Sequence, residues 1–150
     1  MCRPSQREEN EMSFRERVFA KKVGTDSLYI GAEMIHFAIV DASLEPKLPN
    51  FVGRLEDNYY FLSEEIPTEY RKPILTHEVN CFALKACGRH NHCIVATEEE
   101  LRHVSQEIRQ DYLALRRTFF RNLARMYESQ PTSSFYLQIC STRDYLVGVQ

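Results

Sequence analysis

The sequence has no long run of apolar residues and no strong excess of either charge. No segment approaches the roughly 20 consecutive apolar residues of a membrane-spanning helix, and residues 1–11 lack the apolar core of a secretory signal. Nineteen Lys and Arg against 21 Asp and Glu give a formal net charge of -2, so we expect no general attraction to nucleic acid or anionic lipid. These absences favour a cytoplasmic protein that binds neither membranes nor nucleic acid.

Glycine is also scarce, and its scarcity excludes some chemistry. Five glycines in 150 residues leave little room for a Gly-rich loop that cradles phosphate. The turn around a nucleophilic serine that is typical of Ser-His-Asp hydrolases is missing as well. Five cysteines are an odd number, and Cys81, Cys87 and Cys93 lie close together in the sequence. This pattern favours a reducing compartment over a disulfide framework, where clustered thiols are either packed or bound to metal.

Length and composition indicate one folded domain. The chain has 150 residues, of which 43% are hydrophobic and 27% charged, as is ordinary for a globular protein with a single core. Residues 1–13 are polar and carry both charges. We therefore expect a flexible tail over residues 1–13 and a single domain over residues 14–150.

The first half of the chain predicts a small, mostly antiparallel sheet. Short apolar segments separated by turn residues predict strands at residues 18–20, 28–30, 34–40, 51–52 and 58–62. The 34–40 segment is almost continuously apolar, which indicates a central strand covered on both faces.

The second half predicts two helices and two closing strands. A first helix runs from Pro67 to about Cys87 and stops at Gly88. Thr97 followed three positions later by Glu100 matches a capping box, so a second helix is expected from Glu98 to residue 127 or 128, about 45 Å long. Residues 135–140 and 145–147 are predicted as strands. The expected fold class is α+β, with the sheet packed against the first helix and the long second helix.

The predicted long helix suggests self-association. It exceeds the width of a small sheet, so its later part is expected to pack on another subunit of a homodimer or on the C-terminal segment. A protein partner bound through this helix, with its acidic groups paired to Arg116 and Arg117, is the alternative. Arginines recur along it with acidic residues between them, which indicates a solvated face rather than a phosphate-binding one: Arg109, Arg116, Arg117, Arg121 and Arg125.

His77 and Glu78, followed by Cys81, form an incomplete zinc-peptidase motif. In a helix of the HExxH type, two histidines one turn apart bind Zn²⁺ and the glutamate is the general base; here Cys81 stands in place of the second histidine. Glu99 and Glu100, at the predicted start of the second helix, are candidates for a further ligand. With zinc bound, Glu78 would accept a proton from the metal-bound water. A polar pair on a helix face without any metal is the alternative interpretation.

A second candidate metal cluster follows in the loop after the first helix. Thiolate and imidazole are the donors that zinc prefers, and the segment offers four of them: Cys87, His90, His92 and Cys93. The spacing is not that of a CxxC knuckle, and a polar loop with half-buried cysteines is the alternative. Crowding near Cys81 leaves room for one metal ion at most.

The order of elements, together with His77 and Glu78, resembles the minimal zinc-peptidase-like domains of the gluzincin type. In those domains an edge strand precedes the HExxH helix, and a glutamate on a later helix completes the site. The resemblance covers residues 58–103, matches His77 and Glu78 residue for residue, and departs from the family at Cys81. It implies a zinc site, and peptide hydrolysis if zinc binds.

Three functions follow from these patterns. The leading hypothesis is a peptidase-like domain that serves as a non-catalytic or regulatory scaffold. The alternatives are a homo-oligomeric interaction module without metal, whose long helix is the interface, and an active zinc-dependent hydrolase.

Overall fold

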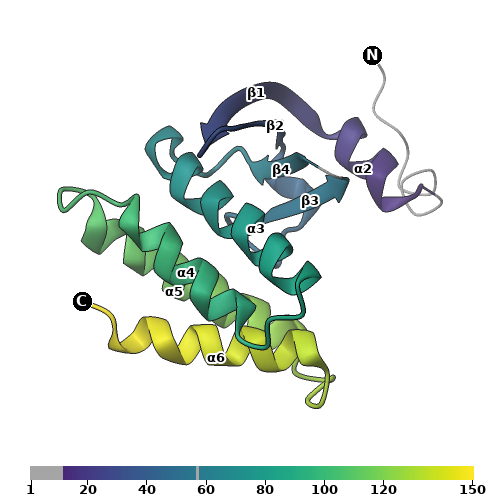
Figure 1. Cartoon of the computed structure of the whole chain (residues 1–150). Coiled ribbons are helices and arrows are strands. Elements are labelled where there is room, and N and C mark those ends of the chain that lie inside the picture. The colour runs from purple at the N-terminus through teal and green to yellow at the C-terminus, as the bar shows by residue number, and fades with distance from the viewer. Residues whose placement is uncertain (1–11, 57) are drawn as a thin grey trace. The chain divides into compact units, whose positions relative to one another are not determined.

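The computed structural model describes residues 12–56 and 58–150 (Figure 1). Contacts between residues group the chain into two compact units, Met1–Ile66 and Pro67–Gln150; we call them the sheet unit and the helical unit. The described residues form one four-stranded mixed sheet and five α-helices, which confirms the α+β fold class. Apart from residues 12 and 13, the expected flexible tail lies outside the described residues.

The sheet unit begins with a helix and continues with four strands. Its elements are α2 (Phe14–Ala20), β1 (Lys22–Ile30), β2 (Glu33–Val40), β3 (Val52–Glu56) and β4 (Tyr59–Ser63). The strand order is β1-β2-β4-β3, with antiparallel pairs β1/β2 and β3/β4 and a parallel pair β2/β4. The sheet is therefore mostly antiparallel, as predicted, and β2 is one of its two central strands.

Two expectations for the sheet unit are wrong. The segment 18–20 belongs to helix α2, because the Ser13 hydroxyl accepts a hydrogen bond from the Glu16 amide at 3.2 Å and caps that helix. The strand at 58–62, which the gluzincin-type resemblance places at an edge, corresponds to β4 and lies between β2 and β3. Hydrogen bonds on both sides of β4 leave β1 and β3 as the edges.

The helical unit contains a short 3₁₀ helix followed by four α-helices. The 3₁₀ helix covers Thr68–Tyr70, and the others are α3 (Arg71–Ala86), α4 (His92–Arg102), α5 (Arg109–Met126) and α6 (Ser134–Gly148). Helix α3 confirms the predicted first helix except at its start, because the helix begins at Arg71 rather than Pro67 and so has Pro73 in its first turn. Helix α4 lies beside α3, and α6 lies beside both α4 and α5 (Figure 1).

The predicted long second helix is wrong, since α4 and α5 are separate. Thr97 is an interior residue of α4, where its hydroxyl donates to the Cys93 carbonyl at 2.9 Å instead of capping a helix. The amides of His103 and Val104 bond to the carbonyls of Glu100 and Leu101, three residues back, and close α4. Helix α5 has 18 residues, or about 27 Å, so the length argument for a dimer no longer holds and self-association stays a prediction.

The predicted closing strands are also wrong, because residues 134–148 form helix α6. The Ser133 hydroxyl accepts from the Tyr136 amide at 3.1 Å and caps it. Its buried residues Ile139, Thr142 and Leu146 follow the helical spacing of three and four.

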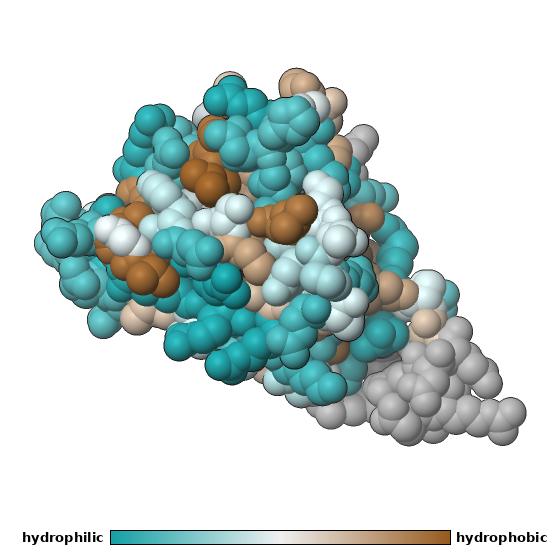
Figure 2. Space-filling model, turned by 90° about the horizontal axis from the view of Figure 1, so that it is seen from below, coloured by the Kyte–Doolittle hydropathy of each residue, from teal (hydrophilic) through white to brown (hydrophobic). Residues whose placement is uncertain are grey.

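Apolar side chains are scattered over the face seen in Figure 2. Helix α6 exposes Phe135, Leu137 and Val147, and the face seen in Figure 2 shows apolar patches separated by polar residues. Single exposed apolar residues are normal for a soluble protein surface. This face therefore provides no continuous apolar interface that would by itself favour a dimer.

We expect the Gly53→Ala substitution to destabilise the sheet unit. A methyl group at Gly53 would come within 2.6 Å of Phe61 Cε1 on the neighbouring strand, and the Phe61 ring is held by contacts with Phe14 and Phe51. The expected loss is about 1–3 kcal/mol in the free energy of unfolding, measured by urea denaturation. Gly24→Ala is the matched control, because its new methyl would meet Ile39 at an ordinary 3.7 Å. Equal stability of the two variants would contradict this account.

Candidate metal centre

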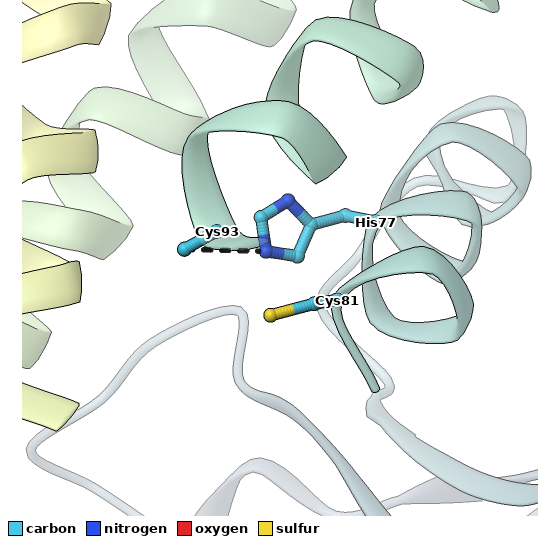
Figure 3. A group of neighbouring side chains, drawn as sticks. All are labelled: His77, Cys81 and Cys93. Atoms are coloured by element: carbon cyan, nitrogen blue, oxygen red, sulfur yellow. Dashed lines mark hydrogen bonds between the residues drawn. The ribbon is translucent and has the colours of Figure 1, made fainter. Parts of the chain in front are cut away.

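Helices α3 and α4 bring one histidine and two cysteines together. His77 and Cys81 lie one turn apart on α3, and Cys93 is the second residue of α4. Their ligand atoms all lie within 4.8 Å of one another, and Figure 3 shows the three side chains converging. The group could hold a metal ion. It combines two residues of the first predicted cluster with one residue of the second.

The His77 ring is held in one orientation by a carboxylate. His77 Nδ1 lies 2.8 Å from Glu100 Oε1, and on the other side of the ring Nε2 lies 3.6 Å from Cys93 Sγ. Only 2% of His77 is exposed. When Nδ1-H donates to Glu100, the lone pair of Nε2 points to the thiols. A metal-binding histidine is usually oriented in this way by a second hydrogen-bonded group.

Glu100 is itself fixed by two residues of α5. Arg116 Nε donates to Glu100 Oε2 at 2.7 Å and Nη2 donates to Oε1 at 3.3 Å, while the Tyr112 hydroxyl also donates to Oε2. Arg116 is 0% exposed and Glu100 is 1% exposed. The guanidinium also lies over the rings of Phe119 and Phe120. This buried charge pair therefore fixes the carboxylate that orients the His77 ring.

The prediction of a solvated arginine face is wrong at Arg116. Arg121 and Arg125, on the same helix, are exposed as expected. A signal was present in the sequence, because Tyr112 precedes Arg116 by four residues and Phe119 follows it by three. All three belong to one apolar stripe of α5.

The pKa values describe a network of paired charges. Burial by itself would raise the pKa of the Glu100 carboxyl, but Arg116 and His77 hold it below its usual value. Burial would likewise lower the pKa of His77, but hydrogen bonds to Cys93 and Glu100 raise it to about 10. Without metal, His77 is therefore protonated at neutral pH.

A hydrogen bond between Cys81 and Cys93 shifts the pKa values of the two thiols in opposite directions. A hydrogen bond from Cys81 lowers the pKa of Cys93 to about 4, and the bond from His77 adds to this effect against the cost of burial. The same bond between the thiols, with burial, raises the pKa of Cys81. In the metal-free centre these shifts favour a thiolate on Cys93 and an imidazolium on His77. Only Cys81 still has a thiol proton to lose before both sulfurs can bind a cation.

Cys93, His77 and Glu100 also follow the order of a thiol-hydrolase triad, in which a nucleophile, a base and an orienting carboxylate lie in line. Cys93 is only 3% exposed, however, and its sulfur forms hydrogen bonds with both Cys81 and His77. A nucleophile has to reach a substrate carbonyl. The arrangement therefore suits a buried metal better than covalent catalysis.

The remaining predicted site residues are placed differently. Glu99 is half-buried and pairs with Arg102 at 2.6 Å and His103 at 3.6 Å, so it is engaged away from the centre. Glu100 lies at the centre as the partner of His77 Nδ1, on the side of the ring opposite the thiols. Glu78 follows His77 directly, and burial raises the pKa of its carboxyl.

The second predicted cluster is divided in the structure. Cys87 and His90 are exposed and lie outside the three-residue group. Cys93 belongs to the centre, and His92 Nδ1 lies 3.1 Å from Cys81 Sγ. The side chain of Gln138 on α6 holds the start of α4 in place. It accepts a hydrogen bond from the Cys93 amide at 3.4 Å and donates one to the His90 carbonyl.

The chain matches no protein family, no curated protein and no solved structure. The resemblance to gluzincin-type domains is therefore carried by its residues alone. Among the described residues, no helix is both long enough and apolar enough to cross a membrane.

Substituting Arg116 tests whether the buried pair supports the centre. Arg116→Met leaves the Glu100 carboxylate buried without its main cation, so we expect the free energy of unfolding of the metal-free protein to fall by about 3 kcal/mol or more. Urea denaturation at neutral pH measures it. Arg125→Met is the matched control, because it removes an exposed arginine from the same helix. A loss below about 1 kcal/mol in Arg116→Met, the range of an exposed ion pair, would contradict the assigned role.

Proposed function

We propose that this chain is a zinc-binding protein of peptidase-like character, in which His77, Cys81 and Cys93 hold Zn²⁺ and the metal joins α3 to α4 in a non-catalytic, regulatory scaffold. The observation that carries the proposal is the hydrogen bond between Glu100 and His77 Nδ1. That bond orients Nε2 toward the sulfurs of Cys81 and Cys93. Its acceptor, the Glu100 carboxylate, is a buried charge paired with the buried Arg116. Buried charges are costly to maintain, which favours a function for this arrangement.

The donor set favours zinc. Two thiolates and an imidazole are soft to borderline ligands, which suit Zn²⁺ rather than Mg²⁺ or Ca²⁺. Tetrahedral zinc with bonds of about 2.3 Å to sulfur and about 2.0–2.1 Å to nitrogen places those two atoms about 3.5–3.6 Å apart, and the distance from Cys93 Sγ to His77 Nε2 is 3.6 Å. The charges also balance, since two thiolates neutralise Zn²⁺ and Glu100 neutralises Arg116.

The strand order supports a scaffold rather than a peptidase. In a gluzincin-type domain the strand before the motif helix is an edge strand, whose free backbone groups can pair with an extended peptide. Here β4 precedes α3 and is paired on both sides, with β2 and with β3. Its backbone is therefore not free to bind a substrate strand.

Active hydrolysis is the second candidate. Three protein ligands are the number found in catalytic zinc sites, which leave the fourth position to water. Glu78 directly follows the ligand His77, where a general base is expected. The hydrolase and the scaffold would bind zinc through the same residues, and only the hydrolase would cleave peptides.

Metal analysis tests the site itself. Protein purified in zinc-containing buffer and then desalted should contain about one Zn²⁺ per chain by elemental analysis. His77→Ala, Cys81→Ser and Cys93→Ser should each lose most of it, because each removes a ligand. Cys87→Ser should retain the zinc, since Cys87 is exposed and outside the group. A metal-free wild type, or equal losses in Cys87→Ser and Cys93→Ser, would refute the proposed site.

A hydrolysis assay separates the two candidates. Zinc-loaded wild type should leave a degenerate fluorogenic peptide library uncleaved, and Glu78→Gln, which keeps all three ligands, should retain zinc and be equally inactive. Cleavage by the wild type that disappears in Glu78→Gln would establish the hydrolase in place of the scaffold.

A further inference from the structure

We infer that His92 supplies a fourth zinc ligand through Nδ1 and closes the site to water. The inference rests on the proposed zinc site of His77, Cys81 and Cys93. His92 is the first residue of α4 and directly precedes Cys93. Its Nδ1 lies 3.1 Å from Cys81 Sγ. This imidazole nitrogen is therefore next to one of the two sulfurs that bind zinc in the proposed site.

The four donors form two matching pairs of sulfur and nitrogen. One pair is Cys93 Sγ and His77 Nε2 at 3.6 Å, and the other is Cys81 Sγ and His92 Nδ1 at 3.1 Å. Each pair links α3 to α4, because each helix provides one histidine and one cysteine. The second pair has to open by about 0.5 Å to reach the tetrahedral separation of about 3.6 Å. His92 also has to move toward the other two ligands, because it lies outside the group whose ligand atoms are all within 4.8 Å of one another; a change in its side-chain torsions would carry that movement.

His92 is free to make this movement. Among the described residues, its side chain makes a hydrogen bond only to Cys81, and it is half-buried. Gln138 holds the backbone on both sides of it, at the His90 carbonyl and the Cys93 amide. The ring can therefore turn while its Cα stays beside the centre.

His92 also lines a groove on the surface of the helical unit, together with the cationic Lys85 and Arg89. This open groove of about 540 Å³ lies along the end of α3 and the start of α6, and His90, His92, Ser134 and Gln138 are among the residues that line it. His77 and Cys93 are almost fully buried. Zinc entering from this groove would meet His92 at the edge of the site, and His92 would stay bound as the outermost ligand.

A fourth protein ligand changes the chemistry of the site. Structural zinc sites have four protein ligands, whereas catalytic ones keep one position for water or substrate. With His92 bound, no coordination position remains for water. Glu78 would then have no metal-bound water to deprotonate, which accounts for a scaffold role even though the base of the motif is present.

The test compares His92→Ala with His90→Ala, an exposed histidine two residues earlier. Zinc affinity is measured by competition with a chromophoric chelator, and imidazole ligands are counted by X-ray absorption at the zinc edge. We expect two imidazoles in the wild type and in His90→Ala, and one in His92→Ala. Zinc affinity in His92→Ala should fall at least about tenfold, because even loss of a group that only supports a ligand costs 10- to 100-fold.

His92→Cys serves as a rescue variant, in case His92→Ala weakens folding as well as binding. A thiolate at this position should restore tight binding and give three sulfur ligands. Stoichiometric zinc in the wild type with one imidazole, and unchanged affinity in His92→Ala, would overturn the inference and leave the three-residue site intact. A wild type that binds no zinc would refute the proposed function and this inference together.

Discussion

The buried carboxylate of Glu100 links three helices of the helical unit. It belongs to α4, accepts hydrogen bonds from Arg116 and Tyr112 of α5, and accepts another from His77 of α3. A carboxylate is costly to bury unless it is paired and its hydrogen-bonding groups are satisfied. Because Glu100 meets this condition only when α3, α4 and α5 are all in place, it constrains their arrangement more strictly than apolar packing alone. The candidate metal centre depends on the same contacts, because Glu100 sets the orientation of the His77 ring.

Charge also determines what the centre can hold. Without metal, Cys93 and His77 form a thiolate and imidazolium pair beside the Glu100 and Arg116 pair. In the proposed site, Zn²⁺ replaces the proton of His77 Nε2 and the proton of Cys81, while the total charge of the buried group stays zero. The surrounding structure therefore accommodates both states without an uncompensated charge. In the proposed site the metal would add bonds between α3 and α4, which already pack against each other and are joined by the exposed segment 87–91.

Local patterns predicted the parts of the fold that local interactions determine. The central strand at 34–40, the helix of His77 and the approach of Cys81 to His77 all follow from periodicity or from spacing on one helix. The errors have long-range causes. Helix α4 starts early because Gln138 of α6 binds the Cys93 amide and the His90 carbonyl, and this contact spans 45 residues. Cys93 was placed in a separate cluster because its contact with His77 spans 16 residues. Arg116 was placed in solvent because its partner Glu100 belongs to another helix. The caps at Ser13 and Ser133 were local signals that could have identified α2 and α6.

Cys81 in place of a second histidine has an electrostatic consequence. A gluzincin-type site with two neutral imidazoles and one carboxylate leaves zinc with a net charge of +1, which stabilises a bound hydroxide. Two thiolates reduce that charge to zero, so the proposed site binds zinc through soft donors but attracts hydroxide less. The same substitution brings the sulfur of α3 close to His92, where an imidazole can take the place of water. In the proposed site, the thiolate of Cys81 thus favours a metal that stabilises the packing of two helices.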